Sequence, residues 1–248
     1  MKEKQLQQKK RRILWGWILA VLLLSISMGT VNVQASKLKL NKTKITVYKG
    51  CTETLKVTGS KKKVKWSSSK KAVASVSSSG KIKGKKKGTA EIYAQIGKRT
   101  LKCKVTVKEP SNAQRLNLAK KEARKIVKKY VISNLNTKER AFVLFRYLTE
   151  HCSWQLNQST EAYKKNYGNE AYAALVLKKA ACSGYARAYK LLCEAAGIPV
   201  SHVNAGNWTH QWNEIKANGK WIKVDAYGGT FADTTGIRKS LLKESKNK

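Results

Sequence analysis

The chain shows two kinds of hydrophobic pattern. Between residues 37 and 108, short runs alternate apolar and polar positions, as half-buried strands do, and Gly, Ser and Lys clusters separate them. These runs are ITVY, TLKV, VKW, VASV, KIKG, AEIYAQI and LKCKVTV. About seven strands in about seventy residues, without a helical period, predict a small all-β sandwich over 37–108.

The pattern becomes helical after a short polar segment, 109–114, which we interpret as a linker. Apolar residues then recur at helical spacing up to residue 131. A second helix is expected to open near Asn136, with Glu139 as its capping-box partner, and a third helical stretch covers EAYAALVLKK. Beyond Pro199 the pattern is that of strands. Residues 115–248 are therefore predicted to form an α+β domain, which makes the chain multidomain.

The first 35 residues have the order of an export signal. A basic stretch that ends at Arg12 precedes the uncharged run ILWGWILAVLLLSIS, and small residues follow at Val33-Gln34-Ala35. We expect residues 1–35 to be a cleaved signal peptide and the rest to be secreted or associated with the cell surface. An uncleaved membrane anchor is the alternative, because residues 13–31 are about long enough to cross a bilayer.

Charge adds a prediction about partners. The chain has 52 Lys and Arg against 14 acids, a net charge of +38. Residues 37–108 hold 22 of these basic residues and only two acids, Glu53 and Glu91. Such a surface attracts anionic polymers. Export argues against nucleic acid, so an anionic cell-envelope polymer is the expected partner. The alternative explanation is that a lysine-biased genome has placed lysines on solvent-exposed faces, where they have no binding role.

One predicted helix contains two cysteines. In ACSGYARAYKLLCEAAGIP, Cys182 falls in the first turn, where free N–H groups and the helix dipole stabilise a thiolate. Gly197 and Pro199 end the helix. Cys193 lies eleven residues later, roughly 16 Å along the axis, so the two thiols cannot bridge each other or share a metal. The sequence has no C-x-x-C or closely spaced His pair, so we expect no metal site.

Other cysteine pairs remain open. Five cysteines are an odd number, so at least one thiol is left over or pairs between chains. Cys51 and Cys103 share the inward face of the predicted sandwich, which makes a bridge plausible; two small buried thiols are the alternative. Cys193 is either a core residue or a disulfide partner for Cys152.

A general base is sought among three histidines. His151 ends the second helix and is expected to be a helix-end residue. His202 lies in a strand-like segment, and the sequence leaves open whether it is a structural residue or a base. His210 precedes QWNEIKANGKWIKVD, in which Asn218-Gly219 is a strong signal for a two-residue type I′ hairpin.

The hairpin turn determines which residues face each other. It pairs Ala217 with Lys220 and, further along the strands, Ile215 with Ile222 and Asn213 with Val224. His210, Trp212, Asp225 and Tyr227 then share one side, with His210 and Asp225 as diagonal neighbours. The alternative is that His210 and Asp225 are ordinary polar residues, either solvated or hydrogen-bonded, without a catalytic role. Together with Cys182, however, they form a Cys-His-Asp set.

The strand-rich segment resembles a known family. VKWSSSKKAVASVSSSGKIKGKKKGTAEIYA is similar to the group 2 bacterial immunoglobulin-like domains, with their W-S-S, V-A-x-V, G-x-(I/V) and G-T-A-x-I landmarks. The resemblance implies an immunoglobulin-like sandwich that serves as a surface spacer or adhesion module. It implies no chemistry.

Residues 115 to about 235 resemble the transglutaminase-like superfamily of cysteine enzymes. The landmarks are Cys followed by Gly-Tyr-Ala, then Ala-Gly-Ile-Pro, His-x-Trp-Asn and Trp-x-x-Val-Asp. The resemblance implies a papain-like/transglutaminase-like fold in which Cys182 is the nucleophile, His210 the general base and acid, and Asp225 the residue that orients His210. DAYGG departs from the Asp-Pro or Asp-Thr of many relatives. Trp154 or Gln155 is the expected side-chain donor to the oxyanion.

The expected function is that of an exported thiol enzyme that cleaves amide bonds of proteins or peptides through an acyl-thioester. An amine acceptor gives cross-linking, and water gives deamidation or proteolysis. No metal or organic cofactor is required. The alternative is a non-catalytic surface adhesion protein with an inert transglutaminase-like domain.

Overall fold

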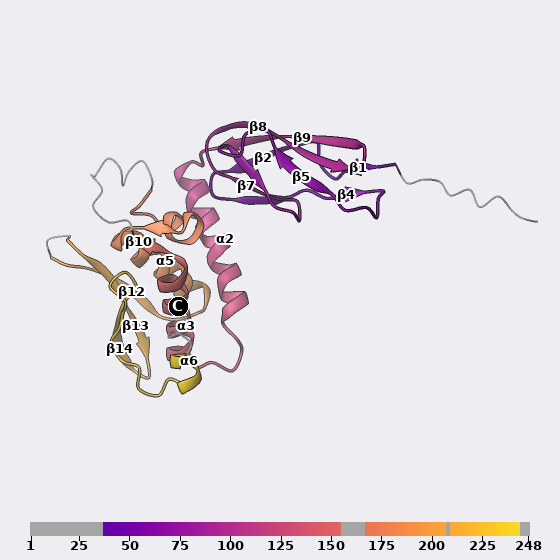
Figure 1. The fold of residues 1–248 in the computed structure, drawn as a ribbon. Helices are drawn as coiled ribbons and strands as arrows, with labels where there is room; N and C mark the ends of the chain where they lie inside the picture. The colour runs from indigo at the N-terminus through magenta and orange to yellow at the C-terminus, as the bar shows by residue number, and fades with distance from the viewer. Residues whose placement is uncertain (1–36, 155–166, 207–208, 244–248) are drawn as a thin grey trace, which may run out of the picture. The chain divides into compact units, whose positions relative to one another are not determined.

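The computed structural model describes residues 37–154, 167–206 and 209–243. The predicted signal peptide and Gln155 lie outside these ranges. Figure 1 shows strands preceding helices along the chain. The expected fold class is confirmed: a β-sandwich is followed by an α+β domain. No helix of the described ranges is both long and apolar enough to span a membrane.

Two sheets form the sandwich, and each buries one face as the alternating pattern predicted. The four-stranded sheet has the order β2-β9-β8-β5, with β2 parallel to β9 and the other pairs antiparallel. Its strands are β2 (Lys44–Tyr48), β5 (Lys65–Ser68), β8 (Gly88–Ile96) and β9 (Arg99–Lys108). The three-stranded sheet comprises β3 (Thr52–Thr54), β7 (Lys81–Gly84) and β6 (Ala74–Val76), and β1 (Lys39–Leu40) pairs with β4 (Val57–Thr58).

The α+β domain begins earlier than the helical pattern suggested. Helix α2 (Asn112–Tyr130) starts inside the segment interpreted as a linker. Ser111 caps it and Gln114 completes a capping box, so local hydrogen bonds define this start. Helix α3 (Thr137–His151) begins as predicted, because the Asn136 side chain accepts from the Glu139 N–H.

Helix α5 (Cys182–Ala195) also has the predicted ends. Cys182 is its first residue, and Gly197 has the positive φ of a helix-terminating glycine (66°). Tyr185 and Tyr189 are fully buried. Their hydroxyls donate to the carbonyls of Cys152, the C-cap residue of α3, and of Ala141 within α3. Helices α3 and α5 are therefore packed antiparallel around one core.

The third helical stretch is shorter than predicted. The structure has one π-helical turn, η1 (Ala173–Leu177), which ends where Lys178 adopts a left-handed φ of 65°. Lys179 and Ala180 form strand β11, which is parallel to β10 (Ser153–Trp154). The pairing with β10 takes Lys179 out of the predicted helical stretch, a tertiary effect that periodicity does not report.

The chain ends in a four-stranded antiparallel sheet against which α5 packs. The sheet has the order β12-β13-β14-β15, followed by helix α6 (Lys239–Lys243). Its strands are β12 (Val200–Asn204), β13 (Gln211–Ala217), β14 (Lys220–Asp225) and β15 (Thr230–Phe231). All three predicted pairs of the β13–β14 hairpin are present. Asn218 and Gly219 have the positive φ values of a type I′ turn, 51° and 77°.

Candidate active site

Cys182 lies at a helix start that lacks a side-chain cap. The N-cap residue, Ala181, offers no hydrogen-bonding side chain, and the first turn of α5 contains no acid. By contrast, α2 and α3 both begin with complete capping boxes. The first-turn N–H groups of α5 are therefore not occupied by a cap and are available to an anion beside the half-buried Cys182.

Residues 168–170 hold this helix start in place. The Ala181 N–H donates to the Gly168 carbonyl (3.0 Å), and the Ser183 hydroxyl bonds the Asn169 side chain (2.8 Å). A Cβ at Gly184 would lie only 2.3 Å from the Gly168 oxygen. The glycine of the Cys-Ser-Gly-Tyr sequence is thus required by a close backbone approach.

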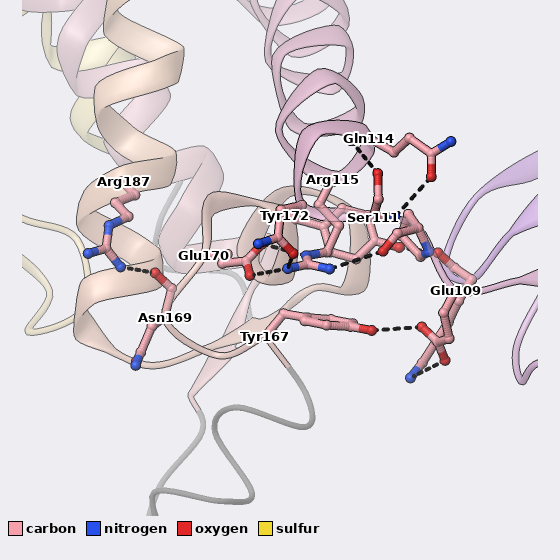
Figure 2. Close-up of polar contacts among 12 residues, drawn as sticks. Glu109, Ser111, Gln114, Arg115, Tyr167, Asn169, Glu170, Tyr172 and Arg187 are labelled. Carbon is pink, nitrogen blue, oxygen red and sulfur yellow. Dashed lines mark hydrogen bonds and ion pairs between the residues drawn. The ribbon is translucent and has the colours of Figure 1, made fainter.

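The same segment is fixed from the other side by α2. Figure 2 shows Arg115, in the first turn of α2, bonded to both oxygens of Glu170 (2.7 Å each). The guanidinium also donates to the Pro110 carbonyl (3.0 Å) and lies 4.2 Å from the ring centre of Tyr167. Arg115 is only 8% exposed. A continuous set of contacts therefore joins the start of α2 to the start of α5.

His210 and Asp225 are in direct contact, as the hairpin register predicted. His210 Nε2 is 2.7 Å from Asp225 Oδ2, and the other carboxylate oxygen accepts the Gly228 N–H at 2.8 Å. Because a carboxylate accepts hydrogen bonds, Nε2 carries the proton of this pair. Nδ1 is then the ring nitrogen that remains to exchange a proton with a thiol.

Tyr227 connects the histidine with the cysteine helix. Its ring centre lies 6.2 Å from that of His210 and 5.5 Å from that of Tyr185, one turn after Cys182. Trp154 is 5.9 Å from the same ring, and it pairs with Ala180 next to the helix start. Ring contacts through Tyr227 thus link His210 to Tyr185 on the helix that begins at Cys182. No hydrogen bond joins Cys182 to His210 in the described residues.

The other two histidines have different surroundings. His202 pairs with Asn213 on β13, on the opposite side of the hairpin from His210, and its Nε2 is 2.9 Å from Gln211. His151 stacks on Tyr147 at the end of α3, with Nδ1 3.1 Å from the Tyr147 carbonyl, which agrees with a helix-end role. Among the described residues, no set of three or more His, Cys, Asp or Glu side chains gathers around a common point.

Neither suggested disulfide is formed, because all five cysteines are free thiols. Cys51 follows β2 at the end where Tyr48 pairs with Lys108, whereas Cys103 lies five residues earlier on β9, roughly 15 Å away along the strand. A bridge needs Cα atoms within about 7 Å. The prediction that Cys103 faces inward was correct. The positions of the two cysteines along the strands nevertheless exclude a Cys51–Cys103 disulfide.

The Cys152–Cys193 pair fails for a similar reason. The Cys152 carbonyl accepts its hydrogen bond from Tyr185, near the start of α5. Cys193 is eight residues further along that helix, about 12 Å away. Burial raises the pKa of both thiols, and that of Cys193 most strongly, so both are unreactive core groups at neutral pH.

Comparisons with known proteins assign both parts of the chain. The model of the transglutaminase-like superfamily matches residues 124–226, and that of the bacterial Ig-like domain (group 2) matches residues 34–107. Each model covers less than half of the chain, and each match lies on the part that the sequence indicated. Both resemblances inferred from the sequence are confirmed.

Three solved structures illustrate these likenesses. A TGase crystal structure is 14% identical over 61% of this chain and 47% of its own, with a TM-score of 0.39. Domains 4 and 5 of the S-layer protein SbsC are 26% identical over 29% of this chain, with a TM-score of 0.24, and the chain spans 50% of their length. A GH10 xylanase with a bacterial Ig-like domain, from termite gut, is 20% identical over 35% of this chain and 23% of its own (TM-score 0.28). No curated protein matches the chain.

Sequence reasoning missed several residues that support this transglutaminase-like domain. The DAYGG segment, which departs from the pattern of many relatives, supplies both the Tyr227 ring and the Gly228 N–H. The Arg115–Glu170 pair joins residues 55 positions apart, and nothing local to either residue indicates the contact. Trp154 lies beside the candidate site, whereas Gln155, the other suggested oxyanion donor, is outside the described residues.

Proposed function

We propose that this protein is a thiol enzyme that cleaves amide bonds through an acyl-thioester on Cys182. The observation that carries the proposal is the 2.7 Å contact between His210 and Asp225. Its setting adds support, because Asp225 is only 11% exposed in its side chain and its second oxygen is already bonded to Gly228. A histidine fixed in this way suits proton exchange with the cysteine at the uncapped start of α5.

In the first half-reaction, Cys182 passes its thiol proton to His210 Nδ1. The thiolate attacks the carbonyl carbon of a carboxamide or peptide bond, and the oxygen becomes an oxyanion. First-turn N–H groups of α5, together with the Trp154 side chain, are the proposed donors to that oxyanion. When the intermediate collapses, the C–N bond breaks, His210 protonates the departing amine, and a thioester forms between Cys182 and the acyl group.

In the second half-reaction, an acceptor attacks the thioester carbonyl and gives a proton to His210. The C–S bond breaks, and His210 returns the proton to the sulfur of Cys182. A lysine amine as acceptor gives an isopeptide cross-link, whereas water gives deamidation or proteolysis. Asp225 acts throughout by keeping Nε2 protonated and the ring oriented.

The proposed location is the cell surface, reached by export. The N-terminal sequence has the order of a signal peptide. Residues 37–108, nearly all of which match the bacterial Ig-like model, carry 22 Lys and Arg against two acids. We propose that this charge holds the enzyme on an anionic polymer of the cell envelope.

Thiol alkylation tests the catalytic proposal. Cys103, Cys152 and Cys193 are buried, and burial raises the pKa of each, as it does for the half-buried Cys51. Iodoacetamide at about pH 6 should therefore label Cys182 first, at least tenfold faster than any other thiol. Mass spectrometry of the labelled peptides gives the rate at each site.

Two histidine variants provide the matched comparison. His210→Ala should slow Cys182 labelling and abolish acyl transfer, whereas His202→Ala, on the opposite side of the hairpin, should change neither by more than about twofold. If Cys182 reacts like an ordinary thiol and His210→Ala has no effect, the domain is inert and serves adhesion.

A second assay distinguishes the types of acyl transfer. Incorporation of a fluorescent primary amine into a glutamine-rich protein without new N-termini indicates a transferase, whereas new N-termini indicate a protease.

A further inference from the structure

Two loops bring five lysines together at one end of the Ig-like domain. Lys70 and Lys71 follow β5, and Lys85, Lys86 and Lys87 precede β8. The backbone N–H groups of Lys85 and Lys86 both donate to the Val73 carbonyl, at 2.8 and 3.2 Å. We call these five residues the lysine end. All five are exposed, and the shared carbonyl keeps their two loops adjacent.

No acid of the described residues forms an ion pair with the lysine end. The domain has two acids, and Glu53 is paired with Lys42 at 3.1 Å. Glu91 accepts a hydrogen bond from the Tyr93 hydroxyl (2.7 Å) and faces Lys104 across the β8–β9 ladder. None of the five ammonium groups forms an ion pair with a described residue. Their repulsion is therefore relieved by solvent and counter-ions, which an anionic ligand would replace.

The residue types on this surface restrict the class of anionic ligand that it can bind. Lysine is a compact point charge that binds phosphate without the planar, bidentate geometry of arginine. The exposed large hydrophobic residues of the described chain are Leu116, Ile132, Trp154 and Trp221, all outside this domain. All five residues of the lysine end are lysines. The surface itself therefore offers neither an aromatic platform that stacks single-stranded nucleic acid nor an apolar face that enters a membrane.

From these observations we infer that the lysine end is a binding surface for a flexible phosphate-bearing polymer that lacks bases and lipid tails, recognised by charge alone. The inference extends the envelope attachment of the proposed function by naming a surface and a ligand class. It does not depend on Cys182 chemistry. Binding by charge alone is multivalent and strongly salt-dependent, and it leaves the polymer free to slide between lysines.

The test measures binding of the full chain to long-chain inorganic polyphosphate as salt is raised from about 50 to 200 mM. In one variant the five lysines of the lysine end become Gln. In the matched control, five basic residues at the opposite end of the same sandwich become Gln: Lys61, Lys63, Lys65, Lys98 and Arg99. Register places Lys65 and Arg99 at the other end, because Lys65 pairs with Gln95 and Arg99 with Ile96, whereas Ser68 pairs with Ile92. The other three residues lie within four positions of these two in the sequence. Both variants have the same net charge.

The lysine-end variant should bind at least about tenfold more weakly at 150 mM salt, and the slope of log affinity against log salt should fall by about 3. The control should lose less than about threefold. Equal losses in the two variants would show that net charge, not this surface, determines binding.

Tighter binding to phosphatidylglycerol vesicles or to single-stranded DNA of matched charge would overturn the ligand class. Cys182→Ala should bind polyphosphate unchanged, so failure of the catalytic proposal is detected separately.

Discussion

At the scale of single residues, Gly228 determines where Asp225 can lie. Its N–H donates to Asp225 Oδ1 at 2.8 Å, and a Cβ at this position would lie 2.6 Å from Oδ2 and 3.0 Å from Cγ. Gly228→Ala should therefore displace the carboxylate from His210 and leave the fold intact, because the residue is exposed. We expect about a 100-fold loss of acyl transfer in steady-state assays, mainly in kcat. Gly206→Ala is the control, since its added Cβ would meet nothing within 4 Å. Equal activity of the two variants would remove Asp225 from the mechanism.

At the scale of elements, the start of α5 differs from those of α2 and α3 in lacking a cap. Ala181 has the extended backbone of an N-cap residue (φ −85°, ψ 176°), so Ala181→Ser should cap the helix and raise the free energy of unfolding by about 1 kcal/mol. The new hydroxyl would then compete with the thiolate and the oxyanion for the same N–H groups. Labelling of Cys182 and acyl transfer should both slow. Ser111→Ala, which removes the cap of α2, should lower the free energy of unfolding and leave the labelling of Cys182 unchanged. A more stable Ala181→Ser protein with undiminished labelling would contradict this account.

Elements also differ in how far the sequence specifies them. The β13–β14 hairpin was predictable because Asn218-Gly219 selects one turn type, which determines every later pair. The start of α3 was predictable because its capping box is local. The parallel β10–β11 pair was not, since it joins two-residue strands that gain their partners only through tertiary packing. The candidate site divides in the same way: register predicted the His210–Asp225 contact, whereas the Arg115–Glu170 support depends on distant segments.

At the scale of the whole chain, ion pairs hold the C-terminal segment against the start of α3. Arg238 bonds both oxygens of Glu139 on α3, at 2.6 and 2.9 Å, and Lys138 bonds Asp233 at 2.7 Å. The Glu139 side chain is only 4% exposed. These bonds lower the pKa of Glu139 from 4.5 to about 2, and Lys138 lowers that of Asp233 from 3.8 to about 2.

The sign of the resulting pH dependence follows from these directions. A carboxylate with a lower pKa in the folded state stabilises the fold above its unfolded pKa, and this stabilisation is lost as pH falls toward the folded pKa. The free energy of unfolding, measured with urea, should therefore decrease as pH falls from about 4.5 to about 2. Glu139→Gln should cost about 2 kcal/mol at pH 7 and flatten that decrease. Glu53→Gln, which removes an exposed pair with Lys42, should change stability by less than about 0.5 kcal/mol at any pH. If the two variants follow the same pH profile, the Glu139–Arg238 contact does not anchor the C-terminal segment.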